Sequence, residues 1–228
     1  MKPDYEIIVH GNNLRLRDGF LGLANVTLIR GAAGPMLVDT GGYVTRTALV
    51  AALADRGLAP ADIKVVFLSH LHFDHAHNID LFPRAKVLVS RAEWEYAKRP
   101  DDQDLFMPWG IHDQLEKHDL DLIEGEGEVA DRVTFFPAPG HTPGSFAVAL
   151  DTDRLGTVVI AGDAIKYAKE AINAACDMAF DSAAAGTRSI ERILEIADRI
   201  VPGHFPELIR TETGVTWTDA AEFPLLIR

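Results

Sequence analysis

The sequence predicts an α/β protein, because strand-like and helix-like hydrophobic spacing alternate along the chain. Short apolar stretches rich in β-branched residues, such as 64–68 and 157–161, are typical of buried strands. A longer stretch over 181–198 repeats apolar residues at helical spacing. Each half of the chain holds strands followed by a helix. This order suits two mixed β-sheets packed face to face with helices outside, although spacing alone indicates only a mixed α/β protein.

The individual elements follow from the same patterns. Strands are expected near residues 5–9, 23–30, 35–39, 64–68, 86–89, 133–137, 145–150, 157–161, 199–202 and 215–217. Helices are expected over 45–57, 90–98 and 181–198. The first helix ends at Gly57, a residue type that commonly stops helices. In the third helix, Ile190, Ile193, Leu194 and Ala197 form a stripe that should face the core.

Length and composition predict a single folded domain over 1–228. A chain of 228 residues can bury a substantial core as one domain, although its length would also permit two. Hydrophobic residues make up 47%, and we find no repeat, low-complexity segment or convincing linker. The N-terminus has no apolar signal segment, and no apolar run reaches the length of a membrane span. We therefore expect a cytoplasmic protein with no membrane partner.

The charge balance bears on the partners. Lys and Arg number 22 against 34 Asp and Glu, which gives a formal net charge of −12. Nucleic acids are normally met by basic surfaces, so this balance disfavours a nucleic-acid partner and leaves a small-molecule substrate as the expectation. The oligomeric state stays open, a homodimer included. Cys176 is the single cysteine, has no obvious base beside it, and is expected to be an inert thiol.

The residues with the most chemical information are 70–75, which read His-Leu-His-Phe-Asp-His. Three imidazoles and a carboxylate are ligands that a transition metal such as Zn²⁺ accepts readily. The apolar stretch 64–68 precedes them, so a strand delivers these side chains into a loop where they can surround an ion. A lone pair of histidines would more often be structural.

Three further strand-like stretches also end in a potential ligand. His141 follows 133–137 inside a Pro-Gly-His-Thr-Pro-Gly turn, Asp163 ends 157–161, and His204 follows 199–202. A glycine adjoins each of these three ligands. The repetition favours a shared metal site over unrelated core histidines.

This ordered set of motifs resembles the metallo-β-lactamase-fold superfamily of metal-dependent hydrolases, over about residues 23–204. Asp39, in Met-Leu-Val-Asp-Thr-Gly, resembles the first motif of that superfamily. The resemblance implies a four-layer αβ/βα sandwich. It also implies that His70, His72 and His141 hold one metal, that Asp74, His75 and His204 hold the other, and that Asp163 bridges them. Asp39 would orient ligands, or would simply cap the following turn.

A site of this kind implies a reaction type. Two zinc ions, with manganese, cobalt or iron as alternatives, would share a hydroxide, because coordination lowers the pKa of water from 15.7 to about 7. The leading hypothesis is therefore a dinuclear zinc hydrolase that uses this hydroxide to cleave a small ester, lactone or thioester.

The string His-Leu-His-Phe-Asp-His-Ala resembles that of acyl-homoserine-lactone lactonases. By that resemblance Asp74 also passes a proton to the leaving alkoxide, and a tyrosine helps to bind substrate. Tyr167 is the candidate, four residues after Asp163 and one further than in that group. Lys166 and Lys169 lie beside it and could instead bond a substrate carbonyl or lie at the surface.

Two alternative functions remain at this stage. Residues 156–163 and 197–204 resemble a short animal member grouped near glyoxalase II, which suggests a phosphodiesterase or RNA-processing hydrolase. Persulfide dioxygenases share the motifs but bind one iron through two His and one Asp, which suggests an oxidoreductase. All seven expected ligands are present here, and ligand completeness favours the hydrolase.

Residues 99–128 read as a long loop with apolar residues amid Asp and Glu. These apolar residues could form a roof over the metals, or could fill a local core; they are Phe106, Met107, Pro108, Trp109 and Ile111. The same segment carries His112, the one histidine outside the motifs that we would test.

Overall fold

The computed structural model describes residues 2–224 and contains two large β-sheets. The first sheet has the strand order β1 (Asp4–Val9), β4 (Val26–Arg30), β5 (Met36–Val38), β6 (Val65–Phe67), β7 (Lys86–Ser90) and β8 (Asp119–Ile123). The second has the order β15 (Gly214–Trp217), β14 (Leu208–Thr211), β13 (Arg199–Pro202), β12 (Thr157–Gly162), β11 (Phe146–Asp151), β10 (Val133–Pro137) and β9 (Gly127–Ala130). Both sheets mix parallel and antiparallel neighbours.

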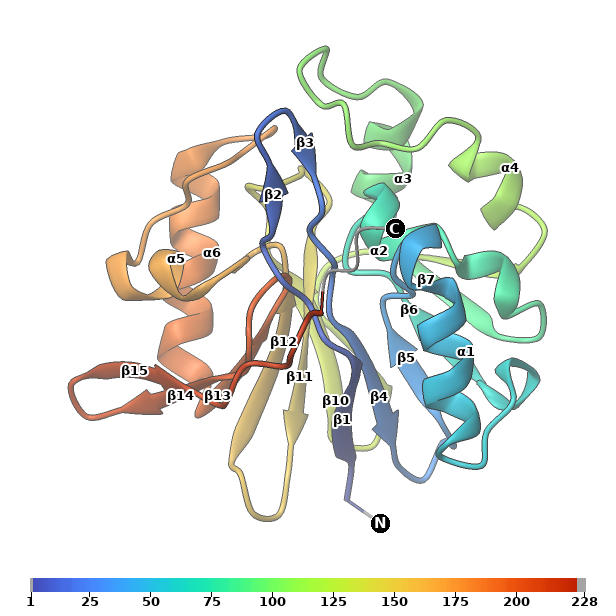
Figure 1. The fold of residues 1–228 in the computed structure, drawn as a ribbon, viewed down its shortest axis with the longest axis horizontal. Coiled ribbons are helices and arrows are strands. Elements are labelled where there is room, and N and C mark those ends of the chain that lie inside the picture. Colours follow the sequence, from blue (N-terminus) through green and yellow to red (C-terminus); the bar gives the residue numbers. More distant parts are fainter. Residues whose placement is uncertain (1, 225–228) are drawn as a thin grey trace.

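Helices cover the outer face of each sheet. They are α1 (Arg46–Ala54), α2 (Phe73–Ala76), α3 (Arg91–Lys98), α4 (Ile111–Leu115), α5 (Ala168–Asn173) and α6 (Ala183–Ile196), with short 3₁₀ turns at Tyr43–Thr45, Pro60–Asp62 and Ile79–Leu81. In Figure 1, α1, α3 and α4 lie on the side of the first sheet, and α5 and α6 lie on the side of the second. The predicted four-layer arrangement of two mixed sheets with outer helices is confirmed.

Alternation along the strands explains why both sheets are buried on two faces. On β6, Val66 belongs to the core beneath the helices of the first sheet, whereas Phe67 belongs to the core between the sheets. On β12, Val158 and Ile160 face the first sheet, whereas Val159 packs beneath α5 and α6. Successive side chains of a strand point to opposite faces, so an uninterrupted apolar run serves two cores.

The expected helices form with slightly shorter bounds. The helix expected over 45–57 is α1, and Gly57 follows it with a φ of +70° as the predicted stop. The Ser90 side chain caps α3, and the Ser182 side chain caps α6. Ile190 and Ile193 of the predicted stripe are fully buried against the second sheet. Among residues 2–224, no helix has both the length and the apolar character needed to cross a membrane.

Several elements escape the sequence analysis. The expected loop over 99–128 contains α4, β8 and β9. β8 reads Asp-Leu-Asp-Leu-Ile, and Asp is depleted in strands, but parallel pairing with β7 forms it at the sheet edge. β14 was also missed, as was a small hairpin of β2 (Arg15–Leu16) and β3 (Gly19–Phe20). One domain over 1–228 stays a prediction, since residues 1 and 225–228 lie outside the described part.

Candidate metal centre

The seven candidate ligands meet at one end of the two sheets. His70 and His72 follow β6, and Asp74 and His75 lie on α2 directly afterwards. On the second sheet, the remaining three follow the ends of β10, β12 and β13; they are His141, Asp163 and His204. All seven are buried. The two ligand-bearing halves of the chain therefore contribute to a single cluster.

Their ligand atoms form overlapping groups of three, each within 4.8 Å of one another. The groups are His70, His72 and His141; His70, His75 and Asp163; and Asp74, His75 and His204. The first and last are the two sets that the sequence resemblance implies. The middle group joins one set to the other through Asp163.

Asp163 lies between the two sets with one oxygen toward each. Its Oδ2 is 3.3 Å from His141 Nε2, while its Oδ1 is 3.2 Å from His75 Nε2 and 3.3 Å from His204 Nε2. Gly203 makes this position available, since a Cβ at that residue would lie 1.9 Å from Oδ1. The glycine beside His204 is thus required by the neighbouring carboxylate.

Each histidine points one ring nitrogen into the cluster. Its other ring nitrogen contacts a partner outside the cluster. His75 Nδ1 donates to Asp39 Oδ2 at 2.8 Å, and Asp39 also accepts from the Ser69 hydroxyl and amide. That hydroxyl lies 3.1 Å from His70 Nδ1. Asp39 therefore orients His75 directly and His70 through Ser69. Its own backbone has a φ of +61°, which is unusual for a residue other than glycine.

The other three histidines are held in the same way. His72 Nε2 donates to Asp104 Oδ2 at 3.0 Å, so its Nδ1 faces the cluster, 3.1 Å from His141 Nε2. His204 Nδ1 donates to the Leu23 carbonyl at 2.9 Å. His141 Nδ1 has a longer contact of 3.4 Å to the Met178 carbonyl. Such partners fix the tautomer and the ring orientation of a metal-binding histidine.

The inward atoms fit a cation that they would jointly coordinate. His70 Nε2, His75 Nε2 and Asp163 Oδ1 are fully buried and have no hydrogen-bond partner within the described residues. Leaving such atoms unpaired is costly in a folded protein. Two buried carboxylates among five imidazoles provide the nitrogen and oxygen donors that divalent transition metals accept. The cluster is therefore a metal-binding arrangement suited to divalent ions.

The electrostatics favour the metal-binding form of some of these residues and oppose it in others. Burial holds the pKa of His70 and of His141 well below the usual value, so both imidazoles stay neutral. Burial alone would raise the pKa of Asp163, but the imidazoles of His204, His75 and His141 outweigh it and hold this pKa well below its usual range. Neutral imidazoles and an ionised carboxylate are the ligand forms of these residues. Burial alone would lower the pKa of His75 and of His204, but the carboxylates around them, with Asp163 the strongest, outweigh it and raise both, so a metal ion there would displace protons.

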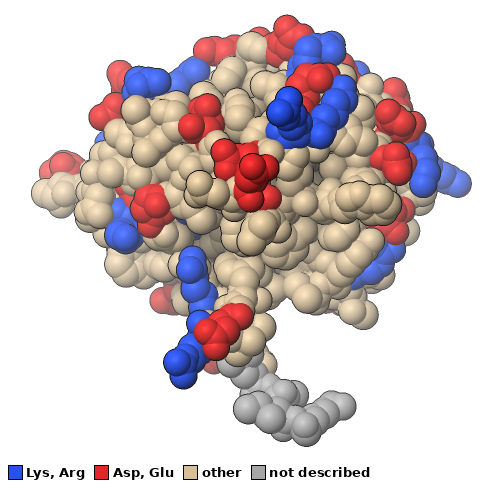
Figure 2. All heavy atoms as spheres, turned by 90° about the horizontal axis from the view of Figure 1, so that it is seen from above, with Lys and Arg blue, Asp and Glu red and all other residues tan. Residues whose placement is uncertain are grey.

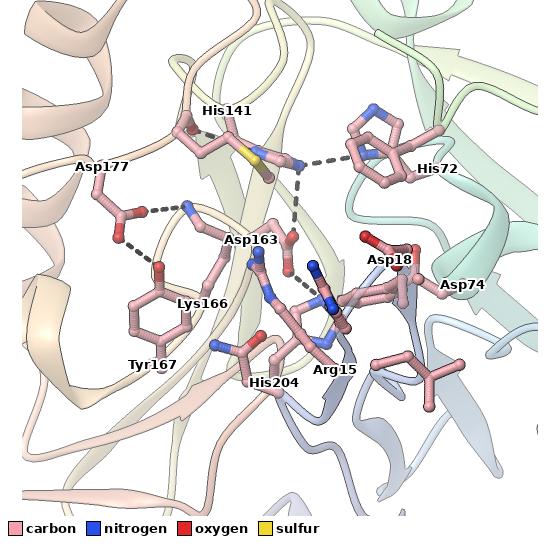
Figure 3. A pocket seen from close by; sticks show the side chains of 17 residues that line it. Arg15, Asp18, His72, Asp74, His141, Asp163, Lys166, Tyr167, Asp177 and His204 are labelled. Carbon is pink, nitrogen blue, oxygen red and sulfur yellow. Dashed lines mark hydrogen bonds and ion pairs between the residues drawn. The ribbon is translucent and has the colours of Figure 1, made fainter.

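A cavity of about 550 Å³ opens onto the cluster. Figure 3 shows His72, Asp74, His141, Asp163 and His204 on its inner side. Lys166, Tyr167 and Asp177 line one wall, and the β2–β3 hairpin lines another. Tyr167 donates a hydrogen bond from its hydroxyl to Asp177. Lys166 is buried and donates to Glu170 Oε1 at 2.6 Å, whereas Lys169 is exposed.

The apolar residues of 99–128 lie in three places: in the cavity, in the core of the first sheet and at the surface. Phe106 lines the cavity and lies against the His72 ring at a centroid distance of 5.7 Å. Ile111 is buried in the core of the first sheet, and Met107 packs against that core. Trp109 is 96% exposed, and His112 bonds the Trp94 carbonyl away from the cluster. One residue of the suggested roof thus reaches the cavity.

A family model for the metallo-beta-lactamase superfamily matches residues 19–204. The chain belongs to this superfamily. It is 36% identical to metallo-beta-lactamase domain-containing protein 1 of Rattus norvegicus, over 86% of this chain and 71% of that protein. The human protein of the same name is also 36% identical, and the match spans 63% of its length.

Two further relatives show the breadth of the similarity. An N-acyl homoserine lactonase of a Bacillus species is 32% identical over 79% of this chain and 67% of that protein. A solved structure of a probable metal-dependent hydrolase from Staphylococcus aureus has a TM-score of 0.81, with 17% identity, over 98% of this chain and 99% of the other. The structural likeness establishes the fold.

Asp104 and Glu93 are two residues of this superfamily member that sequence reasoning missed. Asp104 is buried and accepts from His72, from the Tyr96 hydroxyl at 2.7 Å and from the Phe106 amide at 3.0 Å. It lies in an irregular segment rich in acids, so nothing in the sequence distinguishes it from its neighbours. The contact to His72 depends wholly on how that segment folds back.

Glu93 connects the ligand loops of the two sheets from the first turn of α3. Its Oε1 accepts from the Leu71 amide at 3.0 Å, between His70 and His72. Its Oε2 accepts from the Thr142 hydroxyl at 2.7 Å and from the Gly144 amide at 3.1 Å. A Cβ at Gly144 would lie 2.0 Å from the Glu93 amide nitrogen, so the approach requires glycine. Glu93 thereby fixes the spacing between His72 and His141.

Proposed function

We propose that this chain is a dinuclear zinc hydrolase that cleaves a small ester, lactone or thioester. The observation that carries the proposal is the pair of three-residue ligand groups joined by Asp163, in which three buried inward atoms have no hydrogen-bond partner among the described residues. An arrangement with two complete ligand sets, sharing one carboxylate, matches what a two-metal hydrolytic site needs.

In this proposal His70, His72 and His141 hold one ion, and Asp74, His75 and His204 hold the other. Asp163 lies between the two sets and would hold both ions. Zinc suits these imidazole and carboxylate donors, with manganese, cobalt and iron as alternatives. When bound, such ions lower the pKa of water and polarise a carbonyl oxygen.

The residues of the cavity would divide the remaining work. Asp74 lines the cavity beside His204, and we assign its carboxylate to passing a proton from the attacking water to the leaving oxygen. Tyr167 is assigned to substrate binding. Its hydroxyl proton is engaged by Asp177, so it would have to exchange that acceptor for a substrate carbonyl. The partly closed cavity would orient the ester relative to both groups.

The choice of an ester or lactone rests on the superfamily relatives and on the surface charge. The Bacillus relative, which is 32% identical over 79% of this chain, bears the name N-acyl homoserine lactonase. In Figure 2, Lys and Arg side chains are interspersed with Asp and Glu over the face shown, and Asp and Glu side chains also gather near its centre. A phosphodiesterase acting on nucleic acid would favour a continuous basic surface there.

The test is metal analysis combined with a substrate panel. Protein purified without chelator is analysed by plasma mass spectrometry, and the same preparation is assayed against lactones, thioesters, aryl esters and phosphodiesters. Two zinc ions per chain with ester, lactone or thioester turnover are expected. One iron per chain with oxygen uptake on persulfides would replace the proposal by an oxidoreductase. Turnover of phosphodiesters alone would replace it by a phosphodiesterase.

A further inference from the structure

The cavity has one wall that the metal chemistry leaves unexplained. The β2–β3 hairpin projects past the ends of the two sheets, above the region where the ligand loops meet (Figure 1). Residues 15–20 of this hairpin all line the cavity and are all exposed. The hairpin therefore faces whatever occupies the cavity, with few contacts of its own to satisfy.

The strand register places Arg15 beside Phe20, whose ring contacts the proposed ligand His204. Arg15 pairs directly with Phe20, and paired residues of neighbouring strands share one face of a sheet. The Phe20 ring contacts the His204 ring edge-on at a centroid distance of 6.0 Å, and also lies 6.4 Å from the Phe106 ring. Arg15 thus shares the face that contacts a proposed ligand. Figure 3 draws its side chain in the cavity with His204 and Asp74.

Arg15 also differs from Lys166, the buried cation of the cavity, because no ion pair with an acidic partner engages it among residues 2–224. Lys166 is engaged by Glu170 at 2.6 Å and by Asp177 at 3.5 Å. Within residues 2–224, none of the ion pairs around the cavity involves Arg15 or Arg17. Arg15 nevertheless lies near enough to Tyr167 for its charge to act on that hydroxyl, against burial and Asp177, which raise the pKa of Tyr167.

We propose that Arg15 is an anion-binding residue, so that the substrate is an ester, thioester or lactone carrying a carboxylate apart from the bond that is cleaved. The guanidinium fork matches a carboxylate with two parallel hydrogen bonds. The protein has a net charge of −12, so a free anion is repelled at long range and needs a local cation to be held. This substrate class rests on the proposed hydrolase function.

Matched esters test the proposal on the metal-loaded enzyme. The values of kcat/KM are compared for 4-nitrophenyl butyrate and for mono-4-nitrophenyl glutarate, which adds a distal carboxylate to a similar acyl chain. The wild-type enzyme should have a kcat/KM at least tenfold higher for the glutarate ester than for the butyrate ester. In Arg15→Gln the ratio of these two kcat/KM values should fall by roughly 10–100-fold. Turnover of the butyrate ester, which offers the guanidinium no anion, should fall by much less than turnover of the glutarate ester. Arg15→Lys should retain part of the preference.

Arg17→Gln is the matched control, because it removes the same charge from the turn of the same hairpin, outside the paired strands. It should leave the preference intact. Equal turnover of both esters by the wild-type enzyme, or a preference that survives Arg15→Gln, would overturn the anion subsite while the hydrolase stands. A loss in Arg17→Gln equal to that in Arg15→Gln would assign the effect to the general charge of the hairpin, which also overturns it.

Failure of the proposed function has a different signature, in which neither ester is cleaved by metal-loaded protein. Calorimetric titration with glutarate then tests Arg15 alone. Wild-type protein that binds glutarate at least tenfold more tightly than Arg15→Gln would support the subsite without the hydrolase. Equal affinities would overturn it.

Discussion

The inner surface of the cavity and its hairpin wall are built in opposite ways. Five of the seven proposed ligands line the inner surface, all seven are buried, and each histidine among them is held by a second partner such as Asp39 or Asp104. On the hairpin wall, residues 15–20 are exposed, and Arg15 has no acidic partner among the described residues. The inner surface is therefore fixed before substrate arrives, whereas the wall is free to respond to it.

This difference separates two determinants of function. Ligand atoms must be held within a few tenths of an ångström for metal chemistry, which explains the dense hydrogen bonding around them. Substrate recognition tolerates, and often uses, exposed segments on a rigid scaffold. We infer that the cluster determines the reaction type and that the hairpin wall determines which substrates are accepted. Substitutions in the two regions should then have different signatures.

The largest expected effect is that of Asp163→Ala. Removing the carboxylate that faces both ligand sets should reduce metal content and kcat/KM together, by more than the roughly 100-fold typical of losing an outer partner. Asp177→Ala is the matched control, since it deletes a carboxylate from the cavity wall, and it should leave metal content unchanged. Metal content per chain and kcat/KM are measured for both variants and for the wild type. Normal metal content and turnover in Asp163→Ala would contradict the bridging role.

A smaller effect is expected for Glu93→Gln, which keeps the shape of the side chain but replaces one acceptor oxygen by a donor. At least one of the Leu71, Thr142 and Gly144 donors then loses its partner. The affinity of the His70, His72 and His141 site should fall by roughly 10–100-fold, while the other site changes little. Titration with Co²⁺, followed by its absorption spectrum, distinguishes the sites. An equal loss at both sites would point to general destabilisation.

Metal removal should lower the thermal stability of the protein through the ligand cluster alone, without any substitution. A ligand present at 100 times its dissociation constant stabilises the folded state by about 2.7 kcal/mol. For a chain of this size, 1 kcal/mol shifts Tm by roughly 2–4 °C, so a chelator should lower Tm by roughly 5–10 °C. Arg15→Gln should show the same shift as the wild type, because the hairpin does not contribute ligands. Differential scanning calorimetry measures both, and an unchanged Tm on chelation would mean that the cluster is not loaded.

The same division explains how far the sequence predicts the molecule. Four of the ligands are close together in the chain, namely His70, His72, Asp74 and His75. Each of the other three follows the end of a strand-like stretch. The sequence therefore allowed the cluster to be inferred. Asp104 could not be inferred, because its contact to His72 spans 32 positions through an irregular segment. The strands of the hairpin have two residues each, too few for alternation to register. Where contacts depend on tertiary folding alone, local patterns carry no signal.

The smallest effect is expected for Cys176→Ser, at a residue close to the cluster but without a role in it. The Cys176 Sγ lies 3.4 Å from the Met178 carbonyl, which also accepts from His141. Burial raises the pKa of this thiol, so the sulfur is a poor nucleophile at neutral pH. A serine hydroxyl can donate to the same carbonyl, and kcat/KM should change by less than about twofold. Complete loss of turnover with unchanged metal content and Tm would instead assign the thiol a chemical role, because neither a disturbed His141 nor a damaged fold would leave those two quantities intact.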